Sequence, residues 1–191
     1  MKNIEEIEKL VINVDMVNGF VNEGPMHDEY IRNTIPYQIS LMELAEKDPK
    51  AMNIIVKDTH KEDAVEFKKF PVHCVENTSE SELIDELKRF ETEDALVFKK
   101  NSTSAMHAPG FLEAIDSFKN LKEVVIVGCC TDICVLNLVI PLQTYFDDRN
   151  KDILITVPKK MVETYNSEEH KREEYNEMAF KLMKQAGVVI K

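Results

Sequence analysis

Three of the four cysteines in this sequence lie within six consecutive positions. They are Cys129, Cys130 and Cys134, whereas Cys74 stands apart. Adjacent cysteines are poor disulfide partners for each other, and the paired C-x-x-C ligands of a structural zinc site are absent from the sequence. A lone cysteine is more often a small buried hydrophobic residue. The neighbouring residues therefore decide whether one of these thiols is reactive.

Cys134 stands where a short apolar run gives way to an apolar stretch with helical spacing. A helix N-terminus at this place would lower the pKa of the thiol, and a nearby ammonium group would do the same. A carboxylate such as Asp15 could take the thiol proton and return it to a leaving amine. Backbone N–H groups at Cys130 and Cys134 could receive an oxyanion. This combination indicates amide hydrolysis with Cys134 as the nucleophile.

A second group of residues could hold a divalent cation. Asp58 and His60 stand two positions apart, and Glu66 and His73 follow within the longest irregular stretch, residues 57–81. Mixed imidazole and carboxylate ligands suit zinc, iron or manganese. Ordinary polar loop residues would give the same spacing, so the pattern leaves the two interpretations even.

Short apolar runs rich in β-branched residues predict six strands, at 10–14, 53–56, 95–98, 124–127, 153–157 and 188–190. Runs that are apolar throughout are typical of strands buried on both faces of a parallel sheet. Helical spacing appears at 35–45, 83–87, 133–146 and 167–186. In the last stretch Ser167 is the expected N-cap and Gly187 the stop. The alternation predicts a doubly wound α/β fold with helices on both faces of the sheet.

Ligands of such folds bind at the carboxyl ends of the strands. The first strand runs into Asp15, the second into Asp58 and His60, and the third into Lys99 and Lys100, while the fourth runs into the segment that carries Cys134. Side chains alternate along a strand, so only one of the two lysines can face the site. We therefore expect a carboxylate, an imidazole, an ammonium and a thiol to meet at one edge of the sheet.

Composition limits the classes of protein that remain. The chain has 191 residues, of which 43% are hydrophobic, and a formal net charge of -11. This acidity argues against a nucleic-acid partner, which needs a basic surface. No apolar stretch approaches the roughly 20 residues of a membrane span, and the first residues lack a signal-peptide pattern. We expect one soluble, cytoplasmic domain over residues 1–191.

The chemistry-bearing segments resemble a known family. Residues 127–135 resemble the nucleophile motif of the nicotinamidase/pyrazinamidase group of isochorismatase-like cysteine hydrolases. In the same order along the chain, residues 13–20 resemble its aspartate motif, 58–74 its metal segment and 100–106 its lysine motif. The resemblance covers nearly the whole chain, and the ordered set is much more specific than any one motif.

This resemblance implies a three-layer αβα fold with a six-stranded, mainly parallel sheet, and a homo-oligomer. It implies a catalytic triad of Asp15, Lys100 and Cys134. It also implies an oxyanion hole at the amides of Cys130 and Cys134, next to a cis peptide between Cys129 and Cys130.

The resemblance further implies a substrate and a metal. Asp58, His60 and His73 would hold a divalent cation that binds the pyridine nitrogen of the substrate, with Glu66 nearby or linked through water. The expected pocket residues are Phe20, Phe70 and Cys129. The family pattern is not met at Val17, Gly19, Thr103, Met106, Pro141 and residues 77–80, which bears on the exact substrate and not on the triad.

Three hypotheses follow. The first is deamidation of nicotinamide to nicotinate and ammonia through a thioester on Cys134. The second keeps this chemistry for another small amide, such as an N-carbamoyl compound or a ureide. The third is a non-catalytic metal- or redox-sensing module that uses the spare thiols of Cys129 and Cys130. Isochorismatase chemistry itself is disfavoured, because those vinyl-ether hydrolases need no cysteine nucleophile.

Overall fold

The computed structural model describes residues 2–92 and 95–191, and these contain a parallel sheet of seven strands. The strand order is β3-β2-β1-β4-β5-β7, and the short β6 pairs with the end of β4 beyond β5. Six strands were predicted. The seventh, β6, is two residues long, too short to give a periodic signal. The strands are β1 (Lys9–Val14), β2 (Ala51–Asp58), β3 (Leu96–Lys100), β4 (Glu123–Cys129), β5 (Leu154–Val157), β6 (Val162–Glu163) and β7 (Val189–Ile190).

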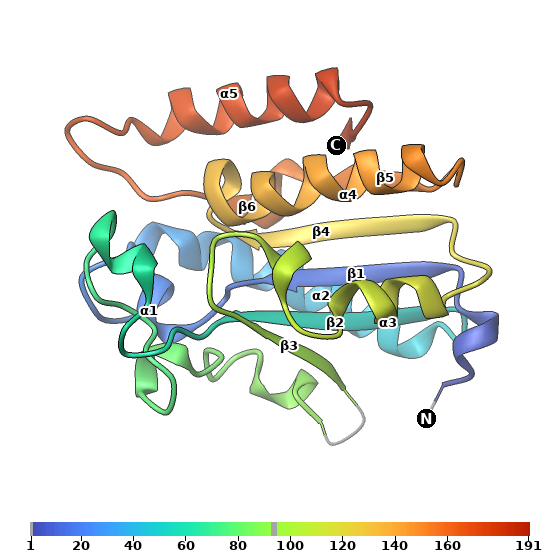
Figure 1. The fold of residues 1–191 in the computed structure, drawn as a ribbon, viewed down its shortest axis with the longest axis horizontal. Coiled ribbons are helices and arrows are strands. Elements are labelled where there is room, and N and C mark those ends of the chain that lie inside the picture. Colours follow the sequence, from blue (N-terminus) through green and yellow to red (C-terminus); the bar gives the residue numbers. More distant parts are fainter. Residues whose placement is uncertain (1, 93–94) are drawn as a thin grey trace.

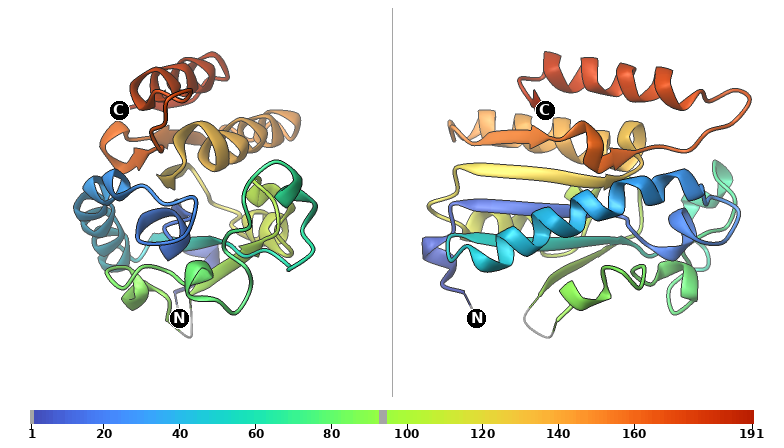
Figure 2. Two further views of the ribbon diagram at one scale, coloured as in Figure 1. Left: turned by 90° about the vertical axis from the view of Figure 1, so that its left-hand side faces the viewer. Right: turned by 180° about the vertical axis from the view of Figure 1, so that it is seen from behind.

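Helices cover both faces of this sheet (Figures 1 and 2). On one face α3 (Phe111–Ser117), α4 (Leu136–Asp148) and α5 (Arg172–Gln185) share a hydrophobic core with the sheet. On the other face α2 (Ile35–Lys47) packs over a second core. The short α1 (Asn18–Val21) follows β1 at the edge of the sheet. The predicted three-layer αβα architecture is therefore confirmed.

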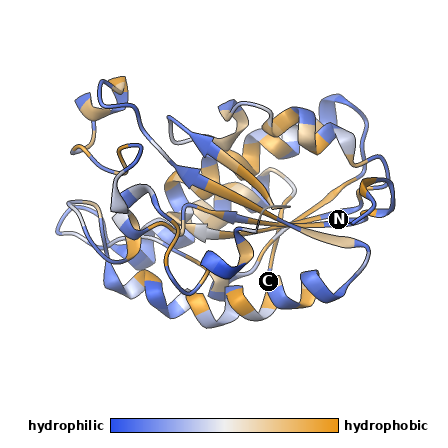
Figure 3. Cartoon of the chain, turned by 90° about the horizontal axis from the view of Figure 1, so that it is seen from below, coloured by the Kyte–Doolittle hydropathy of each residue, from blue (hydrophilic) through white to orange (hydrophobic). Residues whose placement is uncertain are grey.

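The strand sequences explain why the sheet lies in the middle layer. In β1, Leu10, Ile12 and Val14 belong to the core beneath α3 and α4, whereas Val11 belongs to the core beneath α2. Alternate side chains thus enter opposite cores, so most of the strand must be apolar. The exception in its buried part is Asn13, whose amide donates to Oε1 of Gln38 over 2.7 Å. Figure 3 shows the hydrophobic colouring of the central strands between helices of mixed hydropathy.

Two predicted helical stretches differ from the structure. Residues 83–87 form no helix, although Leu83, Ile84 and Leu87 are buried against the α2 side of the sheet. The last helix begins at Arg172 rather than near Ser167, and residues 164–171 are irregular. The expected stop is correct, since Gly187 follows the helix in a left-handed conformation with φ 94°. Over the described residues, the structure has no helix of the length and apolarity that a membrane crossing demands.

The carboxyl ends of the strands meet at the left of Figure 1, and the left view of Figure 2 looks onto them. The register brings chemistry-bearing residues together here. Asp58 pairs with Lys100 across β2 and β3. Val14 pairs with both Val56 and Gly128, so Asp15 emerges in the middle of the sheet, between β2 and β4. The carboxyl ends of β1, β2, β3 and β4 thus form a candidate site.

Candidate active site

Lys100 is the centre of a buried polar cluster at this edge. Its Nζ lies 2.8 Å from Oδ2 of Asp15, 2.6 Å from Oδ1 of Asp58 and 3.7 Å from Sγ of Cys134. The lysine is only 1% exposed. Its neighbour Lys99 points outward and pairs with Glu76 at 3.0 Å. Strand alternation therefore places Lys100, and not Lys99, inside the site.

Burial sets the protonation of the cluster. Although burial opposes its charge, the carboxylates of Asp15 and Asp58 raise the pKa of Lys100 well above its ordinary value. Burial raises the pKa of Asp15 to about 6, against the opposing effect of Lys100. Burial also raises the pKa of the Cys134 thiol well above its usual range, although Lys100 lowers it. The expected lowering of the thiol pKa is therefore not found, and the thiol needs a base.

The backbone around Asp15 is shaped by close packing of β1 and β4. Asp15 adopts a left-handed conformation with φ 54°, and its N–H donates to the Val56 carbonyl over 2.9 Å. Opposite it, Gly128 has φ 120°, and a Cβ there would lie 2.0 Å from the Val14 carbonyl oxygen. Only glycine permits this approach of the two strands. The approach brings the Asp15 carboxylate toward the segment that follows β4.

That segment contains Cys134. The peptide between Cys129 and Cys130 is cis, as the family resemblance implied. One π-helical turn, Thr131–Val135, follows and continues directly into α4. The N–H groups of Ile133 and Val135 both donate to the Cys130 carbonyl over 3.1 Å. Such π-turns are frequent at functional sites. Here the turn buries Cys134 against Lys100 and forms the floor of a pocket.

Asp58, His60 and His73 form a second buried group that shares Asp58 with the lysine cluster. Their candidate ligand atoms all lie within 4.8 Å of one another. Oδ2 of Asp58 lies 3.0 Å from Nε2 of His60 and 3.1 Å from Nε2 of His73. Burial opposes the charge of Asp58, but Lys100 and the two imidazoles hold the pKa of this carboxyl well below its usual range.

The second nitrogen of each imidazole shows that this donor set fits a cation. Nδ1 of His73 lies 2.7 Å from the Pro71 carbonyl, and Nδ1 of His60 lies 3.2 Å from Oδ1 of Asn101. Both partners are oxygen acceptors, since Asn101 Oδ1 also accepts the Lys61 N–H. Each Nδ1 must therefore carry a proton. In the neutral tautomers both Nε2 lone pairs then face a carboxylate oxygen, an arrangement that a divalent cation would stabilise.

Glu66 lies beside this group without joining it. Its Oε2 accepts the N–H of Thr103 over 3.2 Å, and its side chain lines the same pocket as Asp58 and His73. The structure therefore places Glu66 near the cation ligands, outside the set of converging atoms.

The pocket above Cys134 is narrow and mostly apolar, and it opens partly to solvent. Phe20 and Phe70 line it as expected. Cys129 does not: it is fully buried, its Sγ lies 3.2 Å from the Asp15 carbonyl oxygen, and Cys130 forms the wall instead. The lining residues are Phe20, Met26, Asp58, Glu66, Phe70, His73, Thr103, Cys130, Ile133 and Cys134.

Sequence reasoning missed two of these residues, Met26 and Ile133. Ile133 lies inside the cysteine motif, so its place in the wall could have been inferred from its position next to Cys134. Met26 belongs to the loop after α1, and nothing in its local sequence indicates that this loop reaches the pocket.

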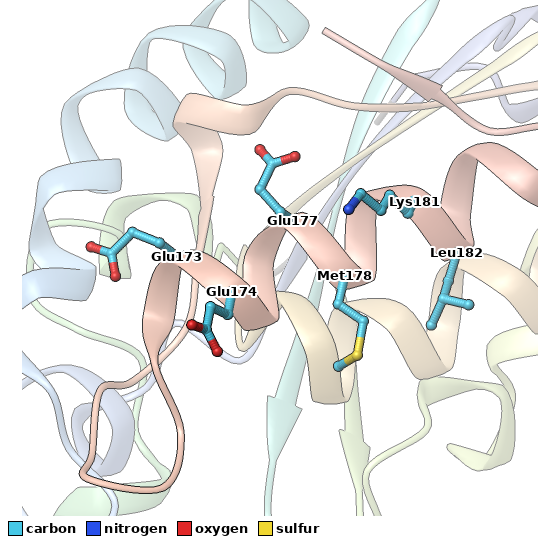
Figure 4. Close-up of a pocket in the computed structure, with 6 residues that line it drawn as sticks. All are labelled: Glu173, Glu174, Glu177, Met178, Lys181 and Leu182. Atoms are coloured by element: carbon cyan, nitrogen blue, oxygen red, sulfur yellow. The ribbon is translucent and has the colours of Figure 1, made fainter.

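A broader hollow on the outer side of α5 is a poor candidate for the site (Figure 4). It is formed by exposed side chains of one helix, and its carboxylates face solvent without a buried partner cluster. The residues that line it are Glu173, Glu174, Glu177, Met178, Lys181 and Leu182. They include no nucleophile. The small pocket at the strand ends is therefore the candidate active site.

Comparison with known proteins points to one group. The family model of the isochorismatase domain matches residues 9–190. Nicotinamidase 1 of Arabidopsis thaliana is 31% identical over 182 residues, which covers 83% of this chain and 72% of the plant protein. This similarity extends over both the cysteine motif and the metal segment of the sequence.

Solved structures share the fold. The pyrazinamidase/nicotinamidase from Streptococcus mutans superimposes with a TM-score of 0.80 at 20% identity, covering 96% of this chain and 100% of that chain. The pyrazinamidase of Pyrococcus horikoshii in complex with zinc gives a TM-score of 0.75 at 24% identity, covering 96% of this chain and 98% of that chain. Both likenesses extend over nearly the full length of each chain.

Proposed function

This chain belongs to the isochorismatase domain family, and we propose that it uses Cys134 to hydrolyse nicotinamide to nicotinate and ammonia. The family and the nicotinamidase relative make it a hydrolase of amide bonds. Membership of this hydrolase family also argues against the alternative of a non-catalytic sensing module. The substrate, the thioester and the role of each residue are the proposal.

One observation carries this proposal. The Lys100 ammonium contacts Asp15 and lies 3.7 Å from the Cys134 sulfur beneath a small pocket. Packing alone does not explain a buried lysine between a carboxylate and a thiol, because burying charged groups costs free energy of folding. It supplies the charge that a thiolate and its carboxylate base need in a dry site.

The reaction follows from these positions. The Cys134 thiol gives its proton to Asp15, and the sulfur attacks the amide carbon while the carbonyl electrons move to oxygen. The amides of Cys130 and Cys134 would donate to that oxyanion. The carbon–nitrogen bond then breaks, Asp15 returns the proton to the leaving nitrogen, and ammonia departs from a thioester. Lys100 keeps its proton and stabilises the sulfur while it is anionic.

Hydrolysis of the thioester reuses the same groups. Asp15, again a carboxylate, takes a proton from water as the water oxygen attacks the thioester carbon. The carbon–sulfur bond breaks, and the sulfur recovers its proton from Asp15. The acid product leaves and ionises to nicotinate, giving its proton to the released ammonia or to water. A pKa raised to about 6 suits this carboxyl to both directions of proton transfer near neutral pH.

The metal segment would bind and orient the ring. Asp58, His60 and His73 would hold a divalent cation, which supplies a Lewis acid for the ring nitrogen of the substrate. Phe20 and Phe70 form aromatic walls against which a flat ring can pack. The narrow pocket favours a small, flat substrate, such as a single ring that bears a carboxamide.

A second substrate class is favoured by one residue. Thr103 lines the pocket at a position where the family resemblance leads one to expect an aromatic side chain. The shorter side chain leaves space in that wall. An N-carbamoyl compound or another small amide would use this space and the same Cys134 chemistry.

Ammonia release from nicotinamide by the purified protein tests the proposal. We expect release that is lost in Cys134→Ala, falls after chelation and persists in Cys74→Ala, which removes a buried thiol that does not line the pocket. Full activity of Cys134→Ala would refute the mechanism. Rapid alkylation of Cys134 without release from nicotinamide would reject this substrate, and a panel of N-carbamoyl compounds and small amides would follow.

A further inference from the structure

The irregular segment between β6 and α5, residues 164–171, contains a histidine that the proposed reaction does not use. We call this segment the strap. It runs along the edge where the strands end, at the upper left of Figure 1. His170 in the strap is only 6% exposed. A buried polar ring outside the pocket needs an explanation from its contacts.

The ring of His170 lies between two tyrosines. Tyr165, in the strap, stacks on one side with centroids 3.9 Å apart and an interplanar angle of 10°. Tyr175, in α5, stacks on the other side at 3.6 Å and 30°. The strap also closes on itself, because the Ser167 N–H donates to the His170 carbonyl over 3.0 Å and Ser167 Oγ accepts the His170 N–H over 3.1 Å. The ring is therefore fixed in position and orientation.

Both ring nitrogens have partners. Nδ1 lies 3.0 Å from the Tyr165 carbonyl, which can only accept, so Nδ1 carries a proton. Nε2 lies 2.8 Å from Oδ2 of Asp132. With Nδ1 donating to the carbonyl, the short contact between Nε2 and Asp132 needs one further proton, which the imidazole and the carboxyl group share.

Asp132 belongs to the π-turn that carries Cys134, two residues further along. Its carboxylate is held by His170 from the side of α5, whereas Cys134 is held near Lys100 from the side of the sheet. The turn is thus fixed from both sides. A shift of Asp132 would move Cys134 relative to Lys100 and Asp15.

The strap also reaches the loop that supplies a pocket wall. The Asn166 N–H donates to Oδ2 of Asp28 over 2.8 Å, and Arg172, which follows the strap, pairs with the same carboxylate. Asp28 stands two residues after Met26, which lines the pocket. The strap therefore contacts both the π-turn that carries Cys134 and the loop that carries Met26.

We propose that His170 is a positioning residue, which holds Asp132 and thereby sets the place of the Cys134 sulfur against Asp15 and Lys100. This inference rests on the proposed function for its catalytic consequence. Misplacement of a reacting group by about 1 Å can cost on the order of 100-fold in rate. The effect should fall on the chemical step, because His170 does not line the pocket.

Two substitutions at His170 separate hydrogen bonding from packing. His170→Phe keeps a ring between the tyrosines and removes the donor to Asp132, whereas His170→Gln keeps a donor near the place of Nε2. For His170→Phe we expect kcat for nicotinamide to fall about 10- to 100-fold with KM changed less than about threefold. His170→Gln should recover most of kcat. His107→Phe, at an exposed histidine, is the matched control.

A second readout does not depend on the substrate. Alkylation of Cys134 by iodoacetamide, followed by peptide mapping, should slow about tenfold in His170→Phe and recover in His170→Gln. If the wild type releases no ammonia from nicotinamide, the proposed substrate fails while this readout still tests the position of the thiol. Folded His170→Phe with unchanged kcat and alkylation would overturn the inference, as would a His170→Gln no better than His170→Phe.

Asp132→Asn provides a test should His170→Phe fail to fold. It keeps the volume of the side chain and weakens the pair with His170. If both residues act through one contact, the double variant His170→Gln/Asp132→Asn should lose no more kcat than the worse single variant. Losses that multiply would show independent roles and would overturn the inference.

Discussion

At the scale of single residues, Lys100 is a buried cation that two carboxylates share. It is buried between Asp15 and Asp58 and is the nearest cation to both carboxylates in the described part of the chain. Removing one partner of a buried ion pair leaves its counter-charge in a medium that solvates it poorly. The stability of the fold and the chemistry of the site therefore depend on the same side chain.

Lys100→Gln should lower the free energy of unfolding by about 3–5 kcal/mol, because it leaves two buried carboxylates without their ammonium. The matched control is Lys99→Gln, one residue earlier on the outer face of β3, which should change it by less than about 0.5 kcal/mol. Urea denaturation in the presence of a chelator measures both, so that no added cation replaces the lost charge. Equal, small effects would show that the carboxyls are neutral when buried.

The same scale shows how far residues can be assigned from sequence. Alternation along a strand admits only one of Lys99 and Lys100 to the site, and the structure selects Lys100. The protonation of Cys134 could not be predicted this way. A helix N-terminus and a lysine both lower a thiol pKa, but burial raises it more, and burial depends on the assembled fold. The prediction of Cys129 as a pocket residue was wrong for a similar reason, since the fold turns its sulfur toward the Asp15 carbonyl.

At the scale of elements, α1 contains a glycine whose neighbours explain a departure from the family pattern. A Cβ on Gly19 would lie 2.6 Å from Sγ of Cys74 and 3.1 Å from Cβ of Glu80. The loop after β2 therefore packs directly on the helix backbone. A larger residue at this position needs a different residue at 74.

Gly19→Ala offers a test in which two physical effects have opposite signs. Helix propensity alone predicts stabilisation by about 1 kcal/mol, whereas overpacking against Cys74 predicts destabilisation by about 1–3 kcal/mol. We expect the second result, measured as a lower midpoint of thermal or urea unfolding. Adding Cys74→Ala should recover part of the loss, with Cys74→Ala alone as the reference. If Gly19→Ala were more stable than the wild type, the loop after β2 would be able to move away from the new methyl group without loss of stability.

Elements buried on both faces were predictable, and elements held by distant partners were not. The apolar strands follow from their composition because few other structures bury every side chain of a short run. Leu83 and Ile84 have helical spacing, yet Leu83 bridges to Val17 and the Ile84 N–H donates to the Met16 carbonyl over 3.1 Å. These tertiary contacts override the local pattern. Likewise, α5 begins later in the sequence than predicted, because polar groups of the strap form hydrogen bonds with other segments.

At the scale of the whole molecule, topology explains why the groups converge. The order β3-β2-β1-β4-β5 places β1 beside β4. Successive strands are added on one side of β1 up to β3 and on its other side from β4 onward. The boundary between β1 and β4 is therefore the switch point where ligands of such folds bind. Any parallel arrangement would bring the carboxyl ends to one edge, so the convergence could be predicted from sequence. The strand order, and hence the contact of Lys100 with both Asp15 and Asp58, could not.

The cation site tests the architecture as a whole, since its ligands come from the end of β2 and from a loop residue, His73, 15 positions after Asp58. We expect protein freed of metal by chelation to take up about one Zn²⁺ or Mn²⁺ per chain and to melt at a higher temperature when loaded. Binding to the folded state alone stabilises it by about 2.7 kcal/mol at a free cation concentration of 100 times Kd.

His73→Gln should abolish both the metal content measured by mass spectrometry and the rise in melting temperature, because it removes one imidazole ligand from a set of three. His107→Gln, an exposed histidine outside the cluster, should preserve both. Unchanged metal content in His73→Gln would place the cation elsewhere. If the wild type took up no cation, the facing Nε2 and carboxylate atoms would have to share protons, and substrate orientation would rest on Phe20 and Phe70 alone.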